Sequence, residues 1–195
     1  MSGQTINQLM THDTLFAGFG GQGVLSMGMT LAYAGMIEGK EVSWMPSYGP
    51  EMRGGTANCI VILSDHKISS PILTRFESVV ALNQPSLDKF EGAVRSGGIL
   101  IYDSTNIIHQ PTRTDLTVCG VPASRSAAEM KNTRVMNMIV LGAFLELRPV
   151  VSLESVPEAL RHVLPERHHR LIPLNQQALE HGRELAKQSI QNVVH

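Results

Sequence analysis

A glycine-rich stretch near the start of the chain, GFGGQG, is the first segment whose composition suits chemistry. Gly18, Gly20 and Gly23 satisfy the spacing GxGxxG, with a strand-like TLFA before them and a helix-like VLSMGMTLAYAGM after them. Glycine permits positive φ and a close approach of another backbone, and the first N–H groups of a helix have no internal acceptor and attract anions. This turn, completed by Gly21 and Gln22, is therefore a candidate site for a phosphate or another anionic group.

Three interpretations of the turn stay open. A dinucleotide site also has an acidic residue about 20 positions further on, at the end of the second strand, which binds the ribose hydroxyls. Here the strand VSWMPSY ends in Ser47 and Tyr48, whereas Glu38 and Glu41 precede it, so the dinucleotide interpretation lacks its second half. Contact with a phosphate or a cofactor tail, and a purely structural turn that packs against a neighbour, are the other two.

A second polar segment, SYGPEMRGG, joins two predicted strands. Its glycines and proline shape a compact bend, and Arg53 offers a rigid fork of donors for a carboxylate or a phosphate. Glu51 could orient that arginine or pair across an interface, and a structural loop with an internal Glu–Arg pair is the alternative. The candidate residues of this loop are Ser47, Tyr48, Gly49, Pro50, Glu51, Arg53, Gly54 and Gly55.

A polar pair on a predicted helix is a third candidate feature. Arg134 and Asn137 lie three residues apart and therefore share a face of that helix, where they could contact a ligand or form a subunit seam. Their neighbours Met136, Met138 and Leu141 are typical of a helix that packs in the core. The pair is therefore either a functional seam or the polar edge of a buried helix.

The spacing of histidines and cysteines argues against a metal site. His168 and His169 are adjacent, so on a helix their side chains would point about 100° apart. Cys59 and Cys119 belong to no CxxC pair, which argues against a disulfide framework, a zinc site and an iron–sulfur cluster. We expect no metal in this chain and no redox role for Cys59, which falls in a strand of buried character.

Short apolar runs alternate with helical patterns and must position these segments. The predicted strands are Leu15–Ala17, Val42–Met45, Ala57–Leu63, Ser78–Leu82, Ile99–Tyr102 and Leu116–Val121. The predicted helices are Val24–Glu38, Pro85–Arg95, Arg125–Asn132 and Val135–Leu147. Alternation of this kind predicts an α/β fold, a Rossmann-like three-layer sandwich with a mostly parallel sheet.

The last part of the chain has a purely helical pattern. Ser155–Glu158 predicts a capping box at the start of one helix, and Leu174–Ile190 predicts a second, amphipathic helix. This tail, about 152–192, is expected to cover the core of about 14–148, and an arm that docks on a partner is the alternative. With 195 residues of which 43% are hydrophobic, we expect residues 1–195 to form a single domain.

The charge balance and the hydropathy pattern exclude some partners and locations. Lys and Arg number 16 against 17 Asp and Glu, and the net charge of -1 provides no bulk attraction for nucleic acid or an anionic membrane. The first residues, MSGQTINQLMTHDT, are polar, and no apolar run reaches the roughly 18 residues of a membrane span. We expect a soluble, cytoplasmic protein without a processed leader.

Taken together, GFGGQG and SYGPEMRGGTANC resemble the gamma subunit of the 2-oxoacid:ferredoxin oxidoreductases, also called keto acid:ferredoxin oxidoreductases. The resemblance continues through SSPI, ALNQPSLDKF, ILIYDS and NMIVLGAF, and it covers roughly Thr14 to Arg148. It implies a subunit rather than a complete enzyme. Members of this family convert a 2-oxoacid, coenzyme A and oxidised ferredoxin into acyl-CoA, carbon dioxide and reduced ferredoxin.

The resemblance also implies partners. Thiamine diphosphate is bound by alpha and beta subunits, iron–sulfur clusters lie elsewhere, and the expected partners are those two subunits, a ferredoxin-like delta subunit and ferredoxin as the acceptor. The absence of cluster-forming cysteines agrees with a chain that carries neither group itself. An isolated copy could form a homo-oligomer through the face that its partners normally cover.

In this family the gamma domain packs against the thiamine-binding subunits and helps to close the channel by which coenzyme A reaches the active site. The resemblance therefore implies that Arg53 and the backbone donors of Gly20–Gly23 meet coenzyme A phosphates or a partner's carboxylate. The version EMRGGTANC of the loop favours 2-oxoglutarate as the substrate. The alternatives are a free-standing nucleotide-binding oxidoreductase that uses NAD or FAD, and a pure interaction module.

Overall fold

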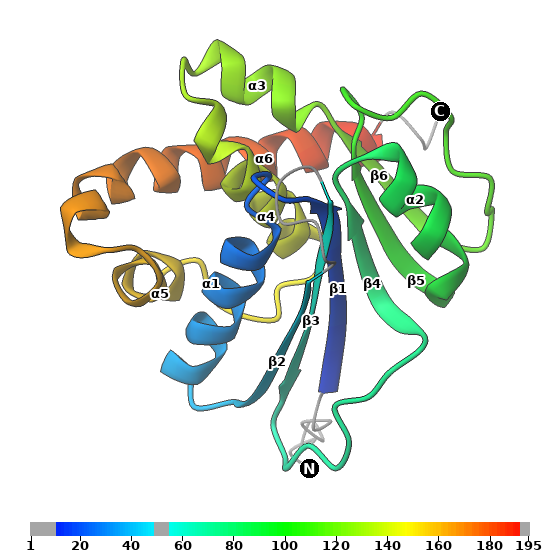
Figure 1. The fold of residues 1–195 in the computed structure, drawn as a ribbon, viewed down its shortest axis with the longest axis horizontal. Coiled ribbons are helices and arrows are strands. Elements are labelled where there is room, and N and C mark those ends of the chain that lie inside the picture. Colours follow the sequence, from blue (N-terminus) through cyan, green and yellow to red (C-terminus); the bar gives the residue numbers. More distant parts are fainter. Residues whose placement is uncertain (1–10, 49–54, 192–195) are drawn as a thin grey trace, which may run out of the picture.

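A computed structural model describes residues 11–48 and 55–191, and its centre is a six-stranded sheet with the order β2-β3-β1-β4-β5-β6 (Figure 1). The strands are β1 (Thr11–Phe19), β2 (Glu41–Tyr48), β3 (Thr56–Ser64), β4 (Phe76–Ala81), β5 (Val94–Asp103) and β6 (Thr117–Val121). The α-helices are α1 (Val24–Ile37), α2 (Gln84–Phe90), α3 (Ala123–Glu129), α4 (Met136–Leu147), α5 (Ser155–Val163) and α6 (Ile172–Gln191). Short 3-10 helices are η1 (Glu91–Ala93), η2 (Thr133–Val135) and η3 (Glu166–Leu171).

The sheet is parallel except at one strand. β1, β4, β5 and β6 pair in parallel, whereas β3 pairs antiparallel with both β1 and β2. The predicted α/β fold with a mostly parallel sheet is therefore confirmed, and β3 is its one reversed strand. In dinucleotide-binding folds the second strand lies directly beside the first. Here β3 occupies that place, so the end of β2 is one strand further from the glycine turn.

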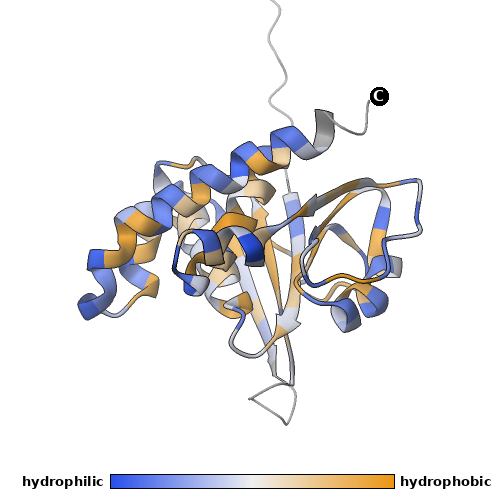
Figure 2. Ribbon diagram, turned by 90° about the horizontal axis from the view of Figure 1, so that it is seen from above, coloured by the Kyte–Doolittle hydropathy of each residue, from blue (hydrophilic) through white to orange (hydrophobic). Residues whose placement is uncertain are grey.

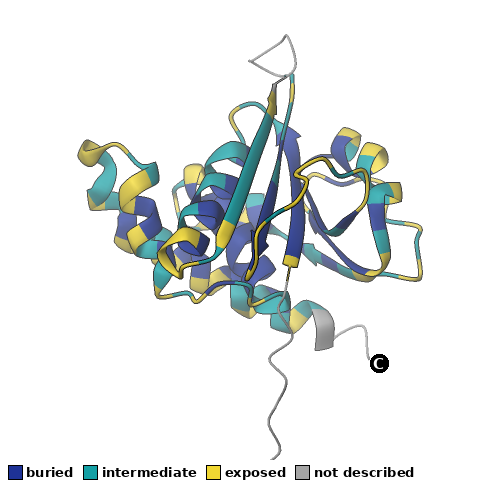
Figure 3. Ribbon diagram, turned by 90° about the horizontal axis from the view of Figure 1, so that it is seen from below, coloured by how far each residue is buried: buried dark blue, intermediate teal, exposed yellow. Residues whose placement is uncertain are grey.

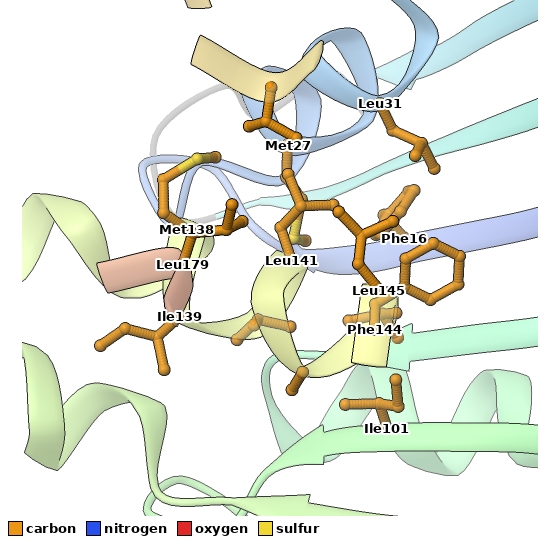
Figure 4. Packing of buried hydrophobic residues seen from close by; sticks show 14 of the residues in the cluster. Phe16, Met27, Leu31, Ile101, Met138, Ile139, Leu141, Phe144, Leu145 and Leu179 are labelled. Atoms are coloured by element: carbon orange, nitrogen blue, oxygen red, sulfur yellow. The ribbon is translucent and has the colours of Figure 1, made fainter. Parts of the chain in front are cut away.

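Side chains alternate between the two faces of the sheet, as the period of two in a strand requires. Phe16 of β1 and Ile101 of β5 face α1, α4 and α6, whereas Leu15 and Leu100 face the side of α2. Figure 4 shows Phe16 against Phe144 of α4, and their rings meet edge to face with centroids 5.9 Å apart. The three layers are thus a thick helical layer, the sheet, and a thinner layer around α2.

The helical tail packs against the core through α6, along which hydrophobic and hydrophilic residues alternate (Figure 2). α6 crosses α4 at two glycines that allow the backbones to touch. A Cβ atom on Gly142 would lie 1.9 Å from the carbonyl oxygen of Leu179, and one on Gly182 would lie 1.8 Å from that of Ile139. The tail is therefore an integral part of the main core.

Two predictions about helix ends are wrong. Ser155 does not cap α5, because the helix begins at this residue and its hydroxyl donates instead to Oε1 of Glu38, at 2.6 Å. The backbone N–H of Ser152 donates to the same oxygen at 2.5 Å, so the end of α1 holds the start of α5. The helix predicted to reach Arg95 ends at Phe90, because η1 follows and β5 begins at Val94.

The two cysteines are buried in the sheet, whose centre is covered while its edge strand β2 is only half-buried (Figure 3). Burial raises the pKa of the Cys59 thiol to about 12 and also raises the pKa of Cys119. Neither thiol therefore forms much of the nucleophilic thiolate at neutral pH. Within residues 11–48 and 55–191, no helix combines the length and the apolar character of a membrane span.

Candidate functional site

The glycine turn connects the end of β1 to the start of α1 in a conformation that needs glycine. Gly21 has φ 96° and Gly23, the N-cap residue of α1, has φ 77°, both in the region that side chains disfavour. No side chain in the described part of the chain caps α1, and the first turn of the helix contains no acidic residue. The first amides of α1 therefore keep their capacity to bind an anion.

The Gln22 side chain fastens the turn to the neighbouring strand. Its Oε1 accepts hydrogen bonds from the backbone N–H of Phe19 at 2.6 Å and from Nδ2 of Asn83 at 3.1 Å. Its Nε2 donates to the carbonyl oxygen of Leu82 at 3.2 Å. A Cβ atom on Gly18 would come within 2.8 Å of Gln22 Oε1. Gly18 and Gln22 thus stabilise the turn from inside, and Gly21 is its exposed residue. The prediction that all backbone donors of Gly20–Gly23 are free is wrong for Gln22, whose N–H donates to the carbonyl oxygen of Phe19 at 3.2 Å, and for Gly20.

The second predicted segment meets the glycine turn at its described ends. The N–H of Gly20 donates to the carbonyl oxygen of Gly55 at 3.0 Å. At the start of the loop, Ser47 and Tyr48 are the last residues of β2 and pair with Asn58 and Ala57 of β3. β3 is the strand next to β1. Gly49, Pro50, Glu51, Arg53 and Gly54 lie outside the described residues. Both ends of the predicted loop thus lie at the same end of the strands as the glycine turn.

The structure brings Arg134 to the glycine turn, which the sequence did not indicate. A cavity of about 320 Å³ is lined by Gly21, Gln22, Gly23, Ser124, Thr133, Arg134 and Met136. The guanidinium of Arg134 is exposed, and no described residue offers it a hydrogen-bond acceptor or an ionic partner. A free guanidinium next to the start of α1 is well placed to bind an oxyanion.

Asn137 lies between this cavity and a second, more apolar one. The second cavity, of about 240 Å³, is lined by Gly23, Ser26, Asn132, Arg134, Val135, Asn137, Met138, Leu160, Leu164, His168, Leu171 and Asn175. Asn137 is only 7% exposed, its Nδ2 donates to the carbonyl oxygen of Gly23 at 3.4 Å, and its Oδ1 has no partner. A Cβ atom on Gly23 would lie 2.7 Å from Nδ2 of Asn137. Arg134 and Asn137 thus line a cavity that extends from the glycine turn to η3 and α6, and their role in a subunit seam stays a prediction.

The segment that carries Arg134 is held by polar contacts below it. Asp103, at the end of β5, is fully buried and accepts the backbone N–H of Ser124 at 3.3 Å and also its hydroxyl. Lys131 has φ 55° and turns the chain out of α3. Oδ1 of Asn132 then caps η2 by accepting the N–H of Arg134 at 3.1 Å. These contacts fix where the Arg134 side chain begins.

The charges around both cavities are one-sided. Among the described residues, neither lining contains an Asp or a Glu, and Arg134 belongs to both. The positive end of the α1 dipole adds to the same potential. In the described part of the chain, no three His, Cys, Asp or Glu residues are arranged to hold a metal ion. The site thus suits an anionic ligand with an apolar portion that reaches the second cavity.

Sequence reasoning missed the supporting residues Asp103, Ser124 and Asn132. The motif ILIYDS placed Asp103 at the carboxyl end of a predicted strand, where binding sites of parallel sheets gather, and this was the available signal. Nothing in the spacing connected Arg134 to residues more than a hundred positions earlier in the chain. That contact depends on how α4 packs against α1.

Comparison with known proteins gives a consistent result. The profile of the pyruvate ferredoxin/flavodoxin oxidoreductase family matches residues 13–185. The ketoisovalerate oxidoreductase subunit VorA of Methanothermobacter thermautotrophicus is 42% identical over 176 residues, which are 90% of this chain. The chain spans 36% of the length of that relative.

Two solved structures have the same fold. The keto/oxoacid ferredoxin oxidoreductase gamma subunit from Geobacter sulfurreducens aligns with a TM-score of 0.80 at 30% identity, over 92% of this chain and 98% of that chain. A 2-oxoglutarate:ferredoxin oxidoreductase from Magnetococcus marinus, solved with 2-oxoglutarate, coenzyme A and succinyl-CoA bound, aligns with a TM-score of 0.82 at 27% identity. That alignment covers 91% of this chain and 31% of the longer one.

Proposed function

The chain belongs to the pyruvate ferredoxin/flavodoxin oxidoreductase family, and from this membership we propose that it is the gamma component of a 2-oxoacid:ferredoxin oxidoreductase complex. The complex would oxidise a 2-oxoacid in the presence of coenzyme A, release carbon dioxide, form acyl-CoA and reduce ferredoxin. The Geobacter gamma subunit, which aligns over 98% of its own length, supports the gamma assignment. Alpha and beta subunits that bind thiamine diphosphate and a ferredoxin-like delta subunit are the proposed partners.

The proposed role of this chain is to bind coenzyme A at the glycine turn. The amides at the start of α1 and the Arg134 guanidinium would hold its phosphate oxygens, and the second cavity would take a less polar portion. Asn137 could complete the contact by accepting a hydrogen bond from a hydroxyl or amide N–H of coenzyme A, because its buried Oδ1 accepts none from any described residue. Arg53, on the loop that ends beside the turn, is proposed to reach the same phosphates or a carboxylate of a partner.

One observation carries this proposal: within the described residues, a guanidinium without a partner and a helix start without a side-chain cap line a cavity that contains no carboxylate. A phosphate-bearing substrate would provide the negative charge that pairs with this positive site. The Magnetococcus complex, which binds coenzyme A, has a domain of the same fold. Electron transfer through iron–sulfur clusters is assigned to the partner subunits, because this chain has only two cysteines and both are buried.

A free-standing NAD- or FAD-binding oxidoreductase is less well supported. β2 ends in Ser47 and Tyr48 without a carboxylate, and β3 separates it from β1, so no acid of the described residues lies where a ribose would bind. A pure interaction module would not need an anion site free of carboxylates. The substrate is proposed only as a 2-oxoacid, since the names of the relatives include both ketoisovalerate and 2-oxoglutarate.

Alanine at Gly21 tests the role of the turn, and alanine at Gly39 is its matched control. Both glycines have positive φ, at 96° and 75°, and a Cβ atom on either would meet nothing within 4 Å. Each substitution should therefore lower the free energy of unfolding by about 1–2 kcal/mol through backbone strain alone. Gly39 lies at the opposite end of α1, about 21 Å away by helix length.

In the assembled complex, Gly21→Ala should raise the KM for coenzyme A about tenfold, because a small misplacement of a binding group is costly. Gly39→Ala should leave it unchanged. Steady-state kinetics at saturating 2-oxoacid measure both values. Equal KM values for coenzyme A in the two variants would refute the assignment of the turn.

A further inference from the structure

A larger polar cavity, of about 600 Å³, lies at the other end of β1. Its lining comes from the first residues of β1, β4 and β5 and from the residues that follow α4, namely Thr11, His12, Glu77, Arg95, Ser96, Gly97, Gly98, Arg148, Pro149 and Val150. The glycine turn lies at the far end of the same strand (Figure 1). The proposed coenzyme A site therefore does not account for these residues. Its volume falls in the range typical of small-molecule sites.

Most charges in this cavity are already paired. Nδ1 of His12 lies 2.7 Å from Oε2 of Glu77, and Nε2 of His12 lies 3.1 Å from Oγ of Ser78. Arg95 contacts the buried carboxylate of Asp13 at 2.9 Å and the second oxygen of Glu77 at 3.4 Å. The hydrogen bond from His12, with the charges of His12, Arg95 and Arg148, holds the pKa of Glu77 below its usual value. Both carboxylates thus have cationic or hydrogen-bonding partners.

Arg148 is the exception. It forms no hydrogen bond and no ion pair through its side chain with any described residue, and its Nε is fully buried without an acceptor. Burying a guanidinium nitrogen without an acceptor is unfavourable, so such groups are normally paired. The ten residues that precede Thr11, MSGQTINQLM, contain no Asp or Glu and cannot supply a side-chain carboxylate. A carboxylate that pairs with Arg148 would therefore come from outside this segment.

We propose that this cavity is a carboxylate-binding site in which Arg148 holds the carboxylate through its guanidinium fork. A planar carboxylate matches two parallel N–H donors of arginine. One unpaired guanidinium beside the already paired Glu77 favours a single negative charge over a phosphate dianion, which the glutamate would repel. The carboxylate belongs either to a small organic acid or to an acidic side chain of a partner subunit.

Titration of the full chain with acetate and succinate, followed by calorimetry and thermal denaturation at constant ionic strength, tests the small-acid source. Saturable binding that Arg148→Met weakens about tenfold or more, and that inorganic phosphate does not reproduce, supports the proposal. Arg148→Lys should bind with intermediate affinity, because lysine keeps the charge but loses the fork. Methionine keeps most of the side-chain volume, and circular dichroism confirms that the variants are folded.

The matched control is Arg75→Met. Arg75 is exposed beside the start of β4 and does not line the cavity, so its removal takes the same charge from the same end of the molecule. Carboxylate binding should be unchanged in this variant. Equal loss in Arg75→Met and Arg148→Met would overturn the proposal, since bulk charge would then explain the binding.

Association with partner subunits tests the second source of the carboxylate, an acidic side chain of a partner. If free carboxylates do not bind, weaker association of Arg148→Met with subunits that co-purify with the chain, restored in part by Arg148→Lys, assigns the carboxylate to a partner. Normal association together with no carboxylate binding overturns the proposal. Because neither outcome depends on the KM for coenzyme A, failure here is distinguishable from failure of the proposed function.

Discussion

Replacement of Gly182 by alanine is expected to force α6 away from α4 and to lower the free energy of unfolding by about 2–3 kcal/mol. The new Cβ atom would lie 1.8 Å from the backbone carbonyl oxygen of Ile139, which no side-chain movement can relieve. The helices must separate, and the apolar contacts between them are lost. This loss exceeds the roughly 1 kcal/mol that alanine gains over glycine within a helix. Thermal denaturation should report a midpoint about 5–10 °C lower.

Gly142→Ala should have a similar effect from the other helix, because its Cβ atom would lie 1.9 Å from the carbonyl oxygen of Leu179. In the double variant the second alanine should cost less than the first, since the helices have already separated. Gly92→Ala is the control, because a Cβ atom there meets nothing within 4 Å and the residue has no positive φ. Full additivity, or an unchanged midpoint for Gly182→Ala, would contradict the close crossing.

Arg134→Met is expected to raise the KM for coenzyme A by roughly 10–100-fold in the assembled complex, the range expected for a lost charge-assisted hydrogen bond. Arg134 belongs to both cavities beside the turn and has no competing partner among the described residues. The KM for the 2-oxoacid should change little, because the proposed contact is with coenzyme A alone. Initial rates with one substrate varied at a time separate the two constants.

Arg125→Met provides the control for Arg134→Met. Arg125 is exposed on α3, in the same segment, and lines neither cavity. The variant removes one positive charge at a similar place in the fold. Its KM for coenzyme A should remain within about twofold of the unmodified complex, as expected for a screened surface charge. Similar increases of the KM for coenzyme A in both variants would mean that Arg134 acts only through the overall electrostatic potential of the surface.

Much of the fold was predictable because its strands are short apolar runs bounded by turn-forming residues. All the predicted strands, from Leu15–Ala17 to Leu116–Val121, overlap observed ones. The reversed direction of β3 was not predicted, because nothing local to Ala57–Leu63 records which neighbour the strand pairs with. The prediction that Ser155 caps α5 was wrong for a related reason. The Ser155 hydroxyl donates a hydrogen bond to Glu38, which is distant in sequence.

The candidate site was predictable only in part. Positive φ at Gly21 and Gly23 follows from residue type, and the Gly20–Gly55 hydrogen bond joins the two motifs that the sequence singled out. The position of Arg134 beside Gly23 depends on the packing of α4 against α1, which hydropathy alone does not specify. The role of Gln22 was also not predicted, because two of its side-chain hydrogen bonds join Leu82 and Asn83, which follow β4 about sixty positions away.

The resemblance to gamma subunits of 2-oxoacid:ferredoxin oxidoreductases is confirmed by the family match and by the solved gamma subunit. It came from two motifs whose combination is more specific than either alone. The functional roles of the motif residues stay proposals, including that of Arg53. The lean toward 2-oxoglutarate also stays a prediction, since VorA is named for ketoisovalerate.

The most direct test of the central claim is purification of the tagged chain from its native host, followed by an assay of ferredoxin reduction with 2-oxoacids and coenzyme A. We predict that thiamine-dependent subunits co-purify and that ferredoxin is reduced only when coenzyme A is present. A chain that purifies alone and inactive, or an activity indifferent to coenzyme A, would contradict the account.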